Sequence, residues 1–231
     1  YIPESNSETI FAVRFTVADD AKKGAIGSIY YNDQTGTSGW AEVYASTKFV
    51  ELLDKYPNDV RHSFIEPQLQ PDGTMQLRSG VPKYFMNKFN WQEGIVNLSS
   101  PVILRLAEMY LNRAEANAKI GTTESNIAAL EDINLIRKRA GLAGTELYSV
   151  TDLKGHNNVL DVVLEERRLE LAFEAHRPFD LFRNNQPMIR EYPGFHGTDQ
   201  FNFSINPDHP RITWYLPERE LIVNKNLVQN P

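Results

Sequence analysis

Three glutamates, Glu166, Glu170 and Glu174, recur at every fourth position of one charged segment. This spacing places their carboxylates on one face of a helix, and paired carboxylates are the groups that glycoside hydrolases use. In hydrolases, however, the two carboxylates usually face each other across a cleft from different elements. This stripe is instead interleaved with arginines and can meet further arginines from a neighbouring helical segment, namely Arg167, Arg168 and Arg177, and Arg105, Arg113 and Arg137. We therefore interpret the stripe as structural ion pairing and keep glycoside hydrolysis as the less favoured alternative.

Other residue types with catalytic or metal-binding chemistry are sparse. None of the five histidines has a second histidine four residues away, as a helical zinc pair would require. The chain has no cysteine, which excludes disulfides, thiolate zinc sites and thiol catalysis. No serine lies in a nucleophile-elbow context, and no glycine-rich phosphate loop follows a strand. The sequence thus predicts no catalytic residue, no metal site and no cofactor.

Aromatic and polar side chains gather in one loop-like segment that favours carbohydrate binding. Sugar rings have apolar C–H faces and polar rims, so a protein that binds them needs exposed aromatic platforms flanked by amide, carboxylate or guanidinium groups. The segment supplies this mixture, and Trp91, between Asn90 and Gln92, is a further candidate. The predicted carbohydrate-binding residues are Tyr30, Tyr31, Asn32, Asp33, Trp40 and Trp91, with Gln34 in the same polar loop.

Each aromatic candidate also has a purely structural interpretation. Trp40 precedes a helical segment and could pack beneath it, and Trp91 lies in a hairpin-like segment, where aromatic side chains are usually core. Adjacent side chains of extended backbone point to opposite sides, so at least one of Tyr30 and Tyr31 should face solvent.

Helical periodicity predicts an antiparallel helix pair followed by a third long helix. The pair spans Ser100–Ile120 and Thr123–Ala140, with Gly121 as the stop between them, and the third helix runs from Asn158 to Phe173. Small residues along the pair roughly follow the tetratricopeptide pattern, in which they let backbones approach closely: Ala107, Ala114, Ala118 and Ala129. Since such pairs need neighbours to cover their apolar faces, we expect further repeats in an N-terminal part of a longer protein.

The remaining segments are shorter. We expect a helix at Ser46–Tyr56, a helical turn at Phe179–Phe182, strands at Thr9–Thr16 and Arg211–Leu216, a loose hairpin within Phe64–Asn97, loops at Asp19–Gly39 and Asn184–Asp208, and an irregular C-terminal end. The predicted fold class is therefore mainly α with irregular loops and a few short strands (α+β).

Composition excludes several classes of partner. The 231 residues carry 30 acidic and 24 basic side chains, the basic ones scattered, so a basic face for nucleic acid or an anionic membrane is not expected. No apolar stretch approaches the roughly 20 residues that span a bilayer. The chain begins at Tyr1 without a signal-peptide pattern, which we interpret as a fragment or a processed chain.

Four segments, in this order and at this spacing, resemble the SusD/RagB family. They are RLAEMYLNRAEANAKIG at Arg105–Gly121, INLIRKRAGL at Ile133–Leu142, LEERRLELAFEAHRPFDLFR at Leu164–Arg183 and LPERELIVNKNLVQNP at Leu216–Pro231. The earlier GWAEVYASTKFVELLDKYPNDVR at Gly39–Arg61 resembles the family's preceding segment, so the resemblance covers most of the chain. One departure is Ala175-His176, where the family usually has a glycine before the arginine.

The resemblance implies a SusD-like fold in which tetratricopeptide-like pairs support a less regular part. Residues 1–231 would form the C-terminal domain, and an N-terminal part with a lipid anchor would lie outside this chain. The family binds oligosaccharides or related nutrients at the outer-membrane surface and delivers them to a SusC-type TonB-dependent transporter, without catalysis. The alternative from another class is a tetratricopeptide-like scaffold that binds a partner protein through its helical face.

Overall fold

The computed structural model describes residues 6–33, 36–191 and 202–230 of the chain. The backbone divides into two units, Tyr1–Ala175 and His176–Pro231, which are taken here one at a time. Gln34, which belongs to the predicted polar loop, lies outside the described residues.

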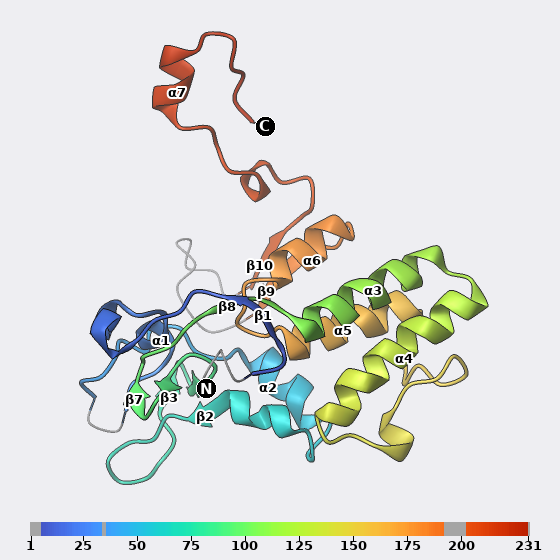
Figure 1. The fold of residues 1–231 in the computed structure, drawn as a ribbon, viewed down its shortest axis with the longest axis horizontal. Helices are drawn as coiled ribbons and strands as arrows, with labels where there is room; N and C mark the ends of the chain where they lie inside the picture. The colour runs from blue at the N-terminus through green and yellow to red at the C-terminus, as the bar shows by residue number, and fades with distance from the viewer. Residues whose placement is uncertain (1–5, 34–35, 192–201, 231) are drawn as a thin grey trace. The chain divides into compact units, whose positions relative to one another are not determined.

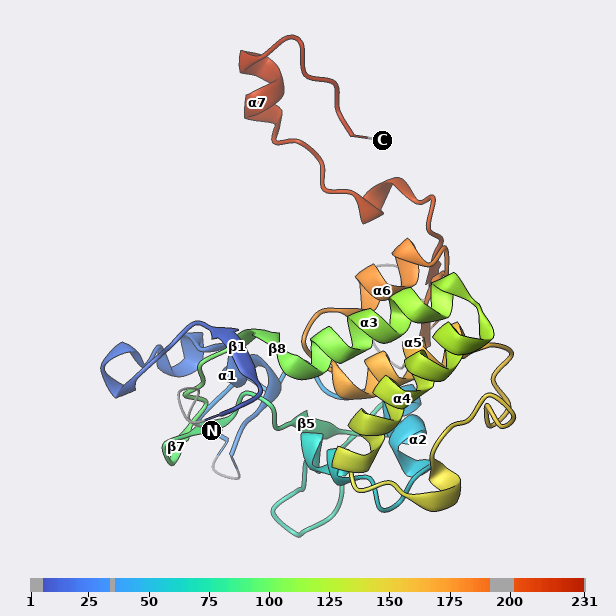
Figure 2. The same ribbon diagram turned by 45° about the vertical axis from the view of Figure 1, so that its right-hand side comes forward.

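Three helices lie side by side and form the main core of the first unit (Figures 1 and 2). They are α3 (Leu106–Ile120), α4 (Thr123–Arg139) and α5 (Val159–Glu170). Gly121 ends α3 with φ +75°, a left-handed conformation that glycine adopts without strain, and the Thr122 side chain caps α4 by accepting from Ser125 N. The predicted helix hairpin and third helix are therefore confirmed.

Small residues bring α3 and α4 together. Ala107, Ala114 and Ala129 are at most 2% exposed, and Ala118 packs against the same cluster. This confirms the predicted close helix contact. The buried residues of this core are Ala107, Leu111, Ala114, Ala129, Leu130, Ile133, Ile136, Tyr148, Val159, Val162, Val163 and Leu171.

One boundary of the helix pair was predicted wrongly. The segment expected to begin a helix at Ser100 first forms the strand β8 (Val102–Arg105), and α3 starts only at Leu106. The strand β1 (Thr9–Ala12) pairs antiparallel with β8 and crosses two register shifts. Backbone pairing with a segment almost a hundred residues away thus overrides the local helix signal of Pro101.

A second core cluster joins α5 to α2 (Thr47–Asp54), which the Ser46 side chain caps by accepting from Phe49 N. Phe49 packs edge-on against Phe173 at a centroid distance of 4.9 Å. The cluster consists of Ala45, Phe49, Leu52, Leu53, Leu169 and Ala172. The predicted short helix is confirmed.

The aromatic-rich segments of the first unit form short hairpins and one short helix. The pairs are β2 (Ile65–Pro67) with β5 (Tyr84–Met86), β3 (Leu77–Arg78) with β4 (Val81–Pro82), and β6 (Trp91–Gln92) with β7 (Ile95–Val96). The expected loop at Asp19–Gly39 in fact contains α1 (Ile26–Tyr30), so Tyr30 is helical. Single turns of 3-10 helix occur at Val17–Asp19, Lys22–Gly24, Val60–Phe64 and Gly144–Glu146.

The second unit holds α6 (Arg177–Arg183), the antiparallel pair β9 (Met188–Glu191) and β10 (Asn202–Ile205), and α7 (Glu218–Val223). The predicted helical turn near Phe179 is confirmed. The predicted strand at Arg211–Leu216 is wrong, because the prolines that flank this region favour a 3-10 turn at Pro210–Ile212 and a helix that starts after Pro217. The segments expected to be irregular thus contain β9, β10 and α7.

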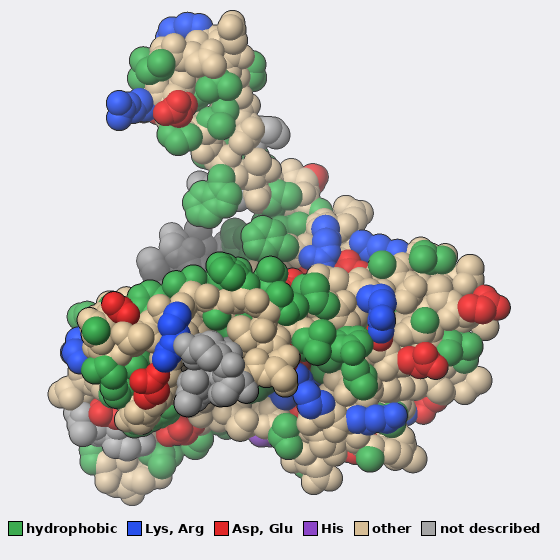
Figure 3. Space-filling view, viewed as in Figure 1, with side chains coloured by type: hydrophobic (Ala, Val, Ile, Leu, Met, Phe, Trp, Pro, Cys, Tyr) green, Lys and Arg blue, Asp and Glu red, His purple; other side chains and the backbone are tan. Residues whose placement is uncertain are grey.

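The structure confirms the predicted fold class, which is helix-dominated with a few short strands. In residues 6–33, 36–191 and 202–230, no helix combines the length and the hydropathy required to cross a bilayer. On the face shown in Figure 3, acidic, basic and hydrophobic side chains are interspersed over the helices of the first unit.

Candidate functional site

Three of the predicted binding residues meet in one aromatic cluster, which we define as Tyr30, Tyr31, Phe85, Phe89 and Trp91. Tyr31 lies 5.2 Å from Phe85 and 6.4 Å from Trp91 between ring centroids, and Tyr30 lies 5.9 Å from Phe89. The rings come from the end of α1, from β5, from the turn after β5 that carries Phe89, and from β6. Segments about 60 residues apart in the sequence are therefore joined through aromatic packing.

Close backbone approach brings α1 against the segment that carries Phe89. A Cβ atom at Gly27 would lie 2.0 Å from the Phe89 carbonyl oxygen, and one at Gly39 would lie 2.0 Å from the Tyr31 carbonyl oxygen. Only glycine fits at either position. The two glycines thus set where the tyrosines sit.

The exposures of the predicted aromatic residues differ sharply. Trp91 is 49% exposed, whereas Tyr31 is only 7% exposed and Tyr30 is half-buried. Burial, with Glu66 as a smaller cause, raises the pKa of Tyr31, so its phenol stays neutral at physiological pH. Trp91 is the ring of the cluster that can stack against a ligand, and Tyr31 supports it from behind.

Trp40 contacts Lys23 instead of the cluster rings. Its indole Nε1 donates to the Lys23 carbonyl oxygen at 3.0 Å, and the Lys23 ammonium lies 5.2 Å from the ring centroid. The ring nevertheless remains 57% exposed, which rules out the interpretation that Trp40 packs beneath the following helix.

The polar residues of the predicted loop shape the loop itself. Asn32 Oδ1 accepts hydrogen bonds from Ser38 N and Gly39 N at 3.1 and 3.2 Å, and Asp33 N donates to Ser38 Oγ at 2.7 Å. Both side chains are half-buried. Asn32 therefore holds the backbone turn that presents Trp40.

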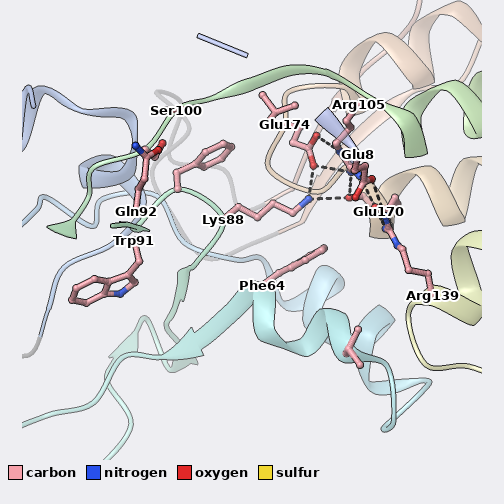
Figure 4. Close-up of a pocket in the computed structure, with 14 residues that line it drawn as sticks. Glu8, Phe64, Lys88, Trp91, Gln92, Ser100, Arg105, Arg139, Glu170 and Glu174 are labelled. Carbon is pink, nitrogen blue, oxygen red and sulfur yellow. Dashed lines mark hydrogen bonds and ion pairs between the residues drawn. The ribbon is translucent and has the colours of Figure 1, made fainter. Parts of the chain in front are cut away.

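A cavity of about 460 Å³ lies beside the aromatic cluster in the first unit. Figure 4 shows charged side chains at one end and Trp91, Gln92 and Ser100 at the other. Its volume is within the range of small-molecule sites. The lining residues are Glu8, Val60, Phe64, Lys88, Phe89, Trp91, Gln92, Ser99, Ser100, Val102, Arg105, Arg139, Glu170 and Glu174.

The charged end of the cavity is a closed ion-pair network. Arg105 Nη1 lies 2.6 Å from Glu170 Oε1, Arg105 Nε lies 2.9 Å from Glu174 Oε2, and Arg139 also pairs with Glu170. Lys88 Nζ donates to the Glu170 carbonyl oxygen and to Glu174. It also lies 4.1 Å from the centroid of the Phe64 ring.

The ion pairs keep the two carboxylates ionised. Burial acts to raise the pKa of Glu170, but Arg105 and Arg139 outweigh it and lower that pKa to about 2. Lys88 and Arg105 likewise overcome the effect of burial and lower the pKa of Glu174. Burial lowers the pKa of Lys88 to about 8, although Glu174 opposes this. A general acid requires a raised carboxyl pKa, which neither glutamate has.

Glu166, the third member of the stripe, lies in a second buried network. Its carboxylate lies 2.6 Å from Arg61 Nη1 and 3.0 Å from Arg137 Nη1, and all three side chains are at most 2% exposed. The Arg137 guanidinium is stacked between the rings of Tyr56 and Tyr148, at 4.3 and 4.6 Å from their centroids.

The interpretation of the glutamate stripe as structural ion pairing is therefore confirmed. Of the expected arginines, Arg105 and Arg137 pair with the stripe, whereas Arg113 pairs with Asp132.

Several cavity residues have no local sequence signal. Glu8, Lys88, Gln92 and Arg139 come from a segment before β1, from the turn after β5, from β6 and from the last turn of α4. Only the position of Gln92 next to Trp91 hints at a shared site. In the part of the chain that the structure describes, no three metal-ligating side chains converge.

Comparison with known proteins places the chain among SusD proteins. The model of the SusD family matches residues 65–231. SusD-like protein P2 of Formosa agariphila is 30% identical over 205 residues, which cover 86% of this chain and 35% of that protein.

Solved structures are similar over nearly the whole chain. A SusD superfamily protein from Bacteroides thetaiotaomicron matches with a TM-score of 0.79 and 26% identity, over 98% of this chain and 49% of that one. Another from Bacteroides vulgatus matches with a TM-score of 0.77 and 26% identity, over 98% of this chain and 46% of that one. The chain thus spans about a third of the curated relative and about half of each solved structure.

Proposed function

Because the chain belongs to the SusD family, we propose that it is part of a glycan-binding protein that holds oligosaccharides at the cell surface for nutrient uptake. In this proposal the whole protein is anchored to the outer membrane through a lipid on an N-terminal part. It delivers its ligand to a SusC-type TonB-dependent transporter. Residues 1–231 act as its C-terminal domain.

The observation that carries the proposal is the half-exposed Trp91 ring, which lines the cavity and packs edge-on against the buried Tyr31. A sugar stacks its C–H face on such a ring, and a ring that is already held in place loses little conformational entropy on binding. Trp40 is the second exposed tryptophan of the proposed site, and Asn32 holds the turn that presents it. Tyr30 and Asp33 complete the proposed site.

The carboxylates beside the cavity support a binding role and not a hydrolytic one. Glu170 and Glu174 both have lowered pKa values and are held by Arg105. Neither can deliver a proton to a glycosidic oxygen at neutral pH. We therefore propose that the protein releases its glycan unaltered.

Isothermal titration of the chain against a panel of plant and host oligosaccharides tests this function. Stacking is worth about 1–2 kcal/mol, so Trp91→Ala and Trp40→Ala should each weaken binding of the best ligand roughly five- to thirty-fold. Trp214→Ala is the matched control, because Trp214 is 90% exposed and lies in the second unit.

Three results would contradict the proposal. One is a wild-type chain that binds none of the oligosaccharides. Another is full affinity in the Trp91→Ala and Trp40→Ala double variant with an unchanged circular dichroism spectrum. The third is reproducible release of reducing sugar by the wild type that is lost in Glu170→Gln, because this result would identify a hydrolase.

A second candidate function, a tetratricopeptide-like protein-binding scaffold, is favoured by one observation. A groove of about 570 Å³ lies between α3 and α4 and is lined by Leu106, Tyr110 and Leu135 among others. Leu106 and Leu135 are 43% and 47% exposed. Leu135→Asp would disrupt binding of a partner protein at this groove and leave glycan affinity unchanged, which separates the two functions.

A further inference from the structure

We propose that the end of the cavity near Trp91 and Gln92 is a subsite for a neutral sugar unit, in which Gln92 accepts a hydrogen bond from a ligand hydroxyl and the Ser99 hydroxyl makes a second one. The inference rests on the proposed glycan-binding function and specifies which groups select the ligand. It predicts that the cavity prefers uncharged sugars over uronates and sulfated sugars.

The buried amide of Gln92 is the first observation. Gln92 is 1% exposed, and its Nε2 donates to the Phe15 carbonyl oxygen at 2.9 Å. This bond fixes the orientation of the amide, since a flipped amide would oppose two oxygen atoms. Gln92 Oε1 is then left buried, and it has no hydrogen-bond partner among the described residues. A buried acceptor without a partner costs folding free energy that a ligand donor can recover.

The hydroxyl of Ser99 is the second observation, and its neighbour Ser100 is the contrast. Ser100 Oγ accepts from Phe15 N at 2.9 Å and donates to the Phe15 carbonyl oxygen at 3.2 Å, so it holds the chain after β1 in place. Ser99 Oγ is also buried, lines the same cavity, and lacks a hydrogen-bond partner within residues 6–33, 36–191 and 202–230. Two unsatisfied polar atoms thus belong to residues that line one cavity.

At the other end of the cavity the cations are engaged by protein acceptors, and the one buried carboxylate oxygen that makes no hydrogen bond, Glu170 Oε2, lies 3.5 Å from Arg61 Nη1. Arg105 uses all five of its N–H groups: Nε binds Glu174, Nη1 binds Glu8 and Glu170, and Nη2 binds Glu174 and the Glu170 carbonyl oxygen. Lys88 is held between Glu174, the Glu170 carbonyl oxygen and the Phe64 ring.

The charges at this end also cancel. The three cations Lys88, Arg105 and Arg139 face the three carboxylates Glu8, Glu170 and Glu174. An anionic ligand would lose its hydration without gaining a cation, which disfavours it.

The remaining lining residues of the cavity are apolar or aromatic, and they form its walls. Phe64, Phe89, Trp91 and Val102 line them. A ligand that fits must therefore combine hydroxyl donors with an apolar face and carry no charge. A neutral pyranose or furanose ring has this combination, because its C–H groups form faces and its hydroxyls lie at the rim.

The test uses the chain and the oligosaccharide panel above, with neutral gluco-, manno-, galacto- and xylo-oligosaccharides in one arm and oligogalacturonate in the other. Gln92→Met keeps the side-chain volume and removes both polar atoms, so it should weaken binding of the best neutral ligand about three- to ten-fold. Ser99→Ala should have a smaller effect in the same direction. It leaves no polar partner unpaired in the free protein, so its fold should be unaffected.

Gln68→Met is the matched control. Gln68 Oε1 is also buried without a hydrogen-bond partner in the described part of the chain, but Gln68 does not line the cavity. This variant should bind the neutral ligand as the wild type does.

Wild-type affinity for the neutral ligand in Gln92→Met and Ser99→Ala would overturn the inference and leave the glycan-binding function intact. Tighter binding of oligogalacturonate than of every neutral oligosaccharide would have the same consequence. An equal loss in Gln68→Met would overturn it too, because the effect would then be general destabilisation. A wild-type chain that binds no glycan would overturn the proposed function and this inference together.

Discussion

Two regions of the first unit differ in how their polar groups are satisfied. Around α5, the buried carboxylates Glu166 and Glu170 each pair with at least two arginines, and Arg105 has no N–H group left over. Glu170 Oε2 makes no hydrogen bond, but it lies 3.5 Å from the cation of Arg61. Around the β6–β7 hairpin, Trp91 is half exposed and Gln92 and Ser99 have buried oxygen atoms with no partner among the described residues.

The difference separates the part that specifies the fold from the part that can bind. Polar groups that pair fully with one another have nothing to offer a ligand, and removing one of them leaves a buried charge uncompensated. Half-exposed rings and unpaired acceptors contribute less to the fold but can contact a ligand. We therefore expect substitutions near α5 to change stability, and substitutions near the hairpin to change affinity.

The largest expected effect on stability comes from Glu170→Gln. This change leaves Arg105 and Arg139 without their shared carboxylate in a site where Glu170 is 1% exposed. Loss of one partner of a buried pair typically costs about 3–5 kcal/mol of unfolding free energy, which urea denaturation measures. The matched control is Glu51→Gln, because Glu51 forms an exposed pair with Lys48 and should lose less than about 1 kcal/mol. Equal losses in the two variants would remove the distinction between the regions.

Acid should destabilise the chain through the same carboxylate. The pKa of Glu170 is lowered from its ordinary value of 4.5 to about 2 in the folded protein. Its contribution is therefore fully present above about pH 4.5 and is lost as the pH falls toward 2, because the unfolded chain takes up the proton first. The loss amounts to about 3 kcal/mol for this group. Between these pH values, the free energy of unfolding should depend less steeply on pH in Glu170→Gln than in the wild type, as measured by urea denaturation at each pH. Identical pH dependences in the two proteins would contradict the prediction.

A smaller effect on stability is expected at the uncharged contact between α3 and α4. Ala114 is 0% exposed between α3 and its neighbours, so Ala114→Leu should cost on the order of 1–3 kcal/mol through overpacking. Ala116→Leu on the exposed face of the same helix is the control and should be close to neutral. Thermal melting distinguishes them, and an unchanged melting temperature in Ala114→Leu would mean that this face of the hairpin is not packed.

Local sequence signals were sufficient for most of the helical part. The glycine stop at Gly121 and the alanine stripe through Ala114 predicted α3, α4 and their contact, because helix ends and apolar periodicity are encoded within a few residues. The same signals failed at Ser100–Arg105, where pairing with β1 decides, and at Arg211–Leu216, where β-branched and aromatic residues favoured a strand that the flanking prolines prevent.

The candidate site was only partly predictable. Trp91 and the Tyr30-Tyr31 pair were found from composition and context, but their meeting in one cluster depends on Gly27 and Gly39, which let α1 approach the hairpin. The prediction that Tyr30 and Tyr31 lie within a loop missed α1, whose five residues are too short to show a clear period. In the structure Tyr31 is buried and Tyr30 is half-buried.

By itself, the sequence determined the fold class, the helix hairpin, the third helix and the presence of a charge-paired glutamate stripe, since these follow from periodicity and from residue types that lie close together along the chain. Only the tertiary structure decided which cations neutralise that stripe and what lies beside Trp91. Lys88 reaches Glu174 across 86 residues and Arg61 reaches Glu166 across 105. Contacts over such separations depend on how distant backbone segments pack, and no local pattern of residues records that packing.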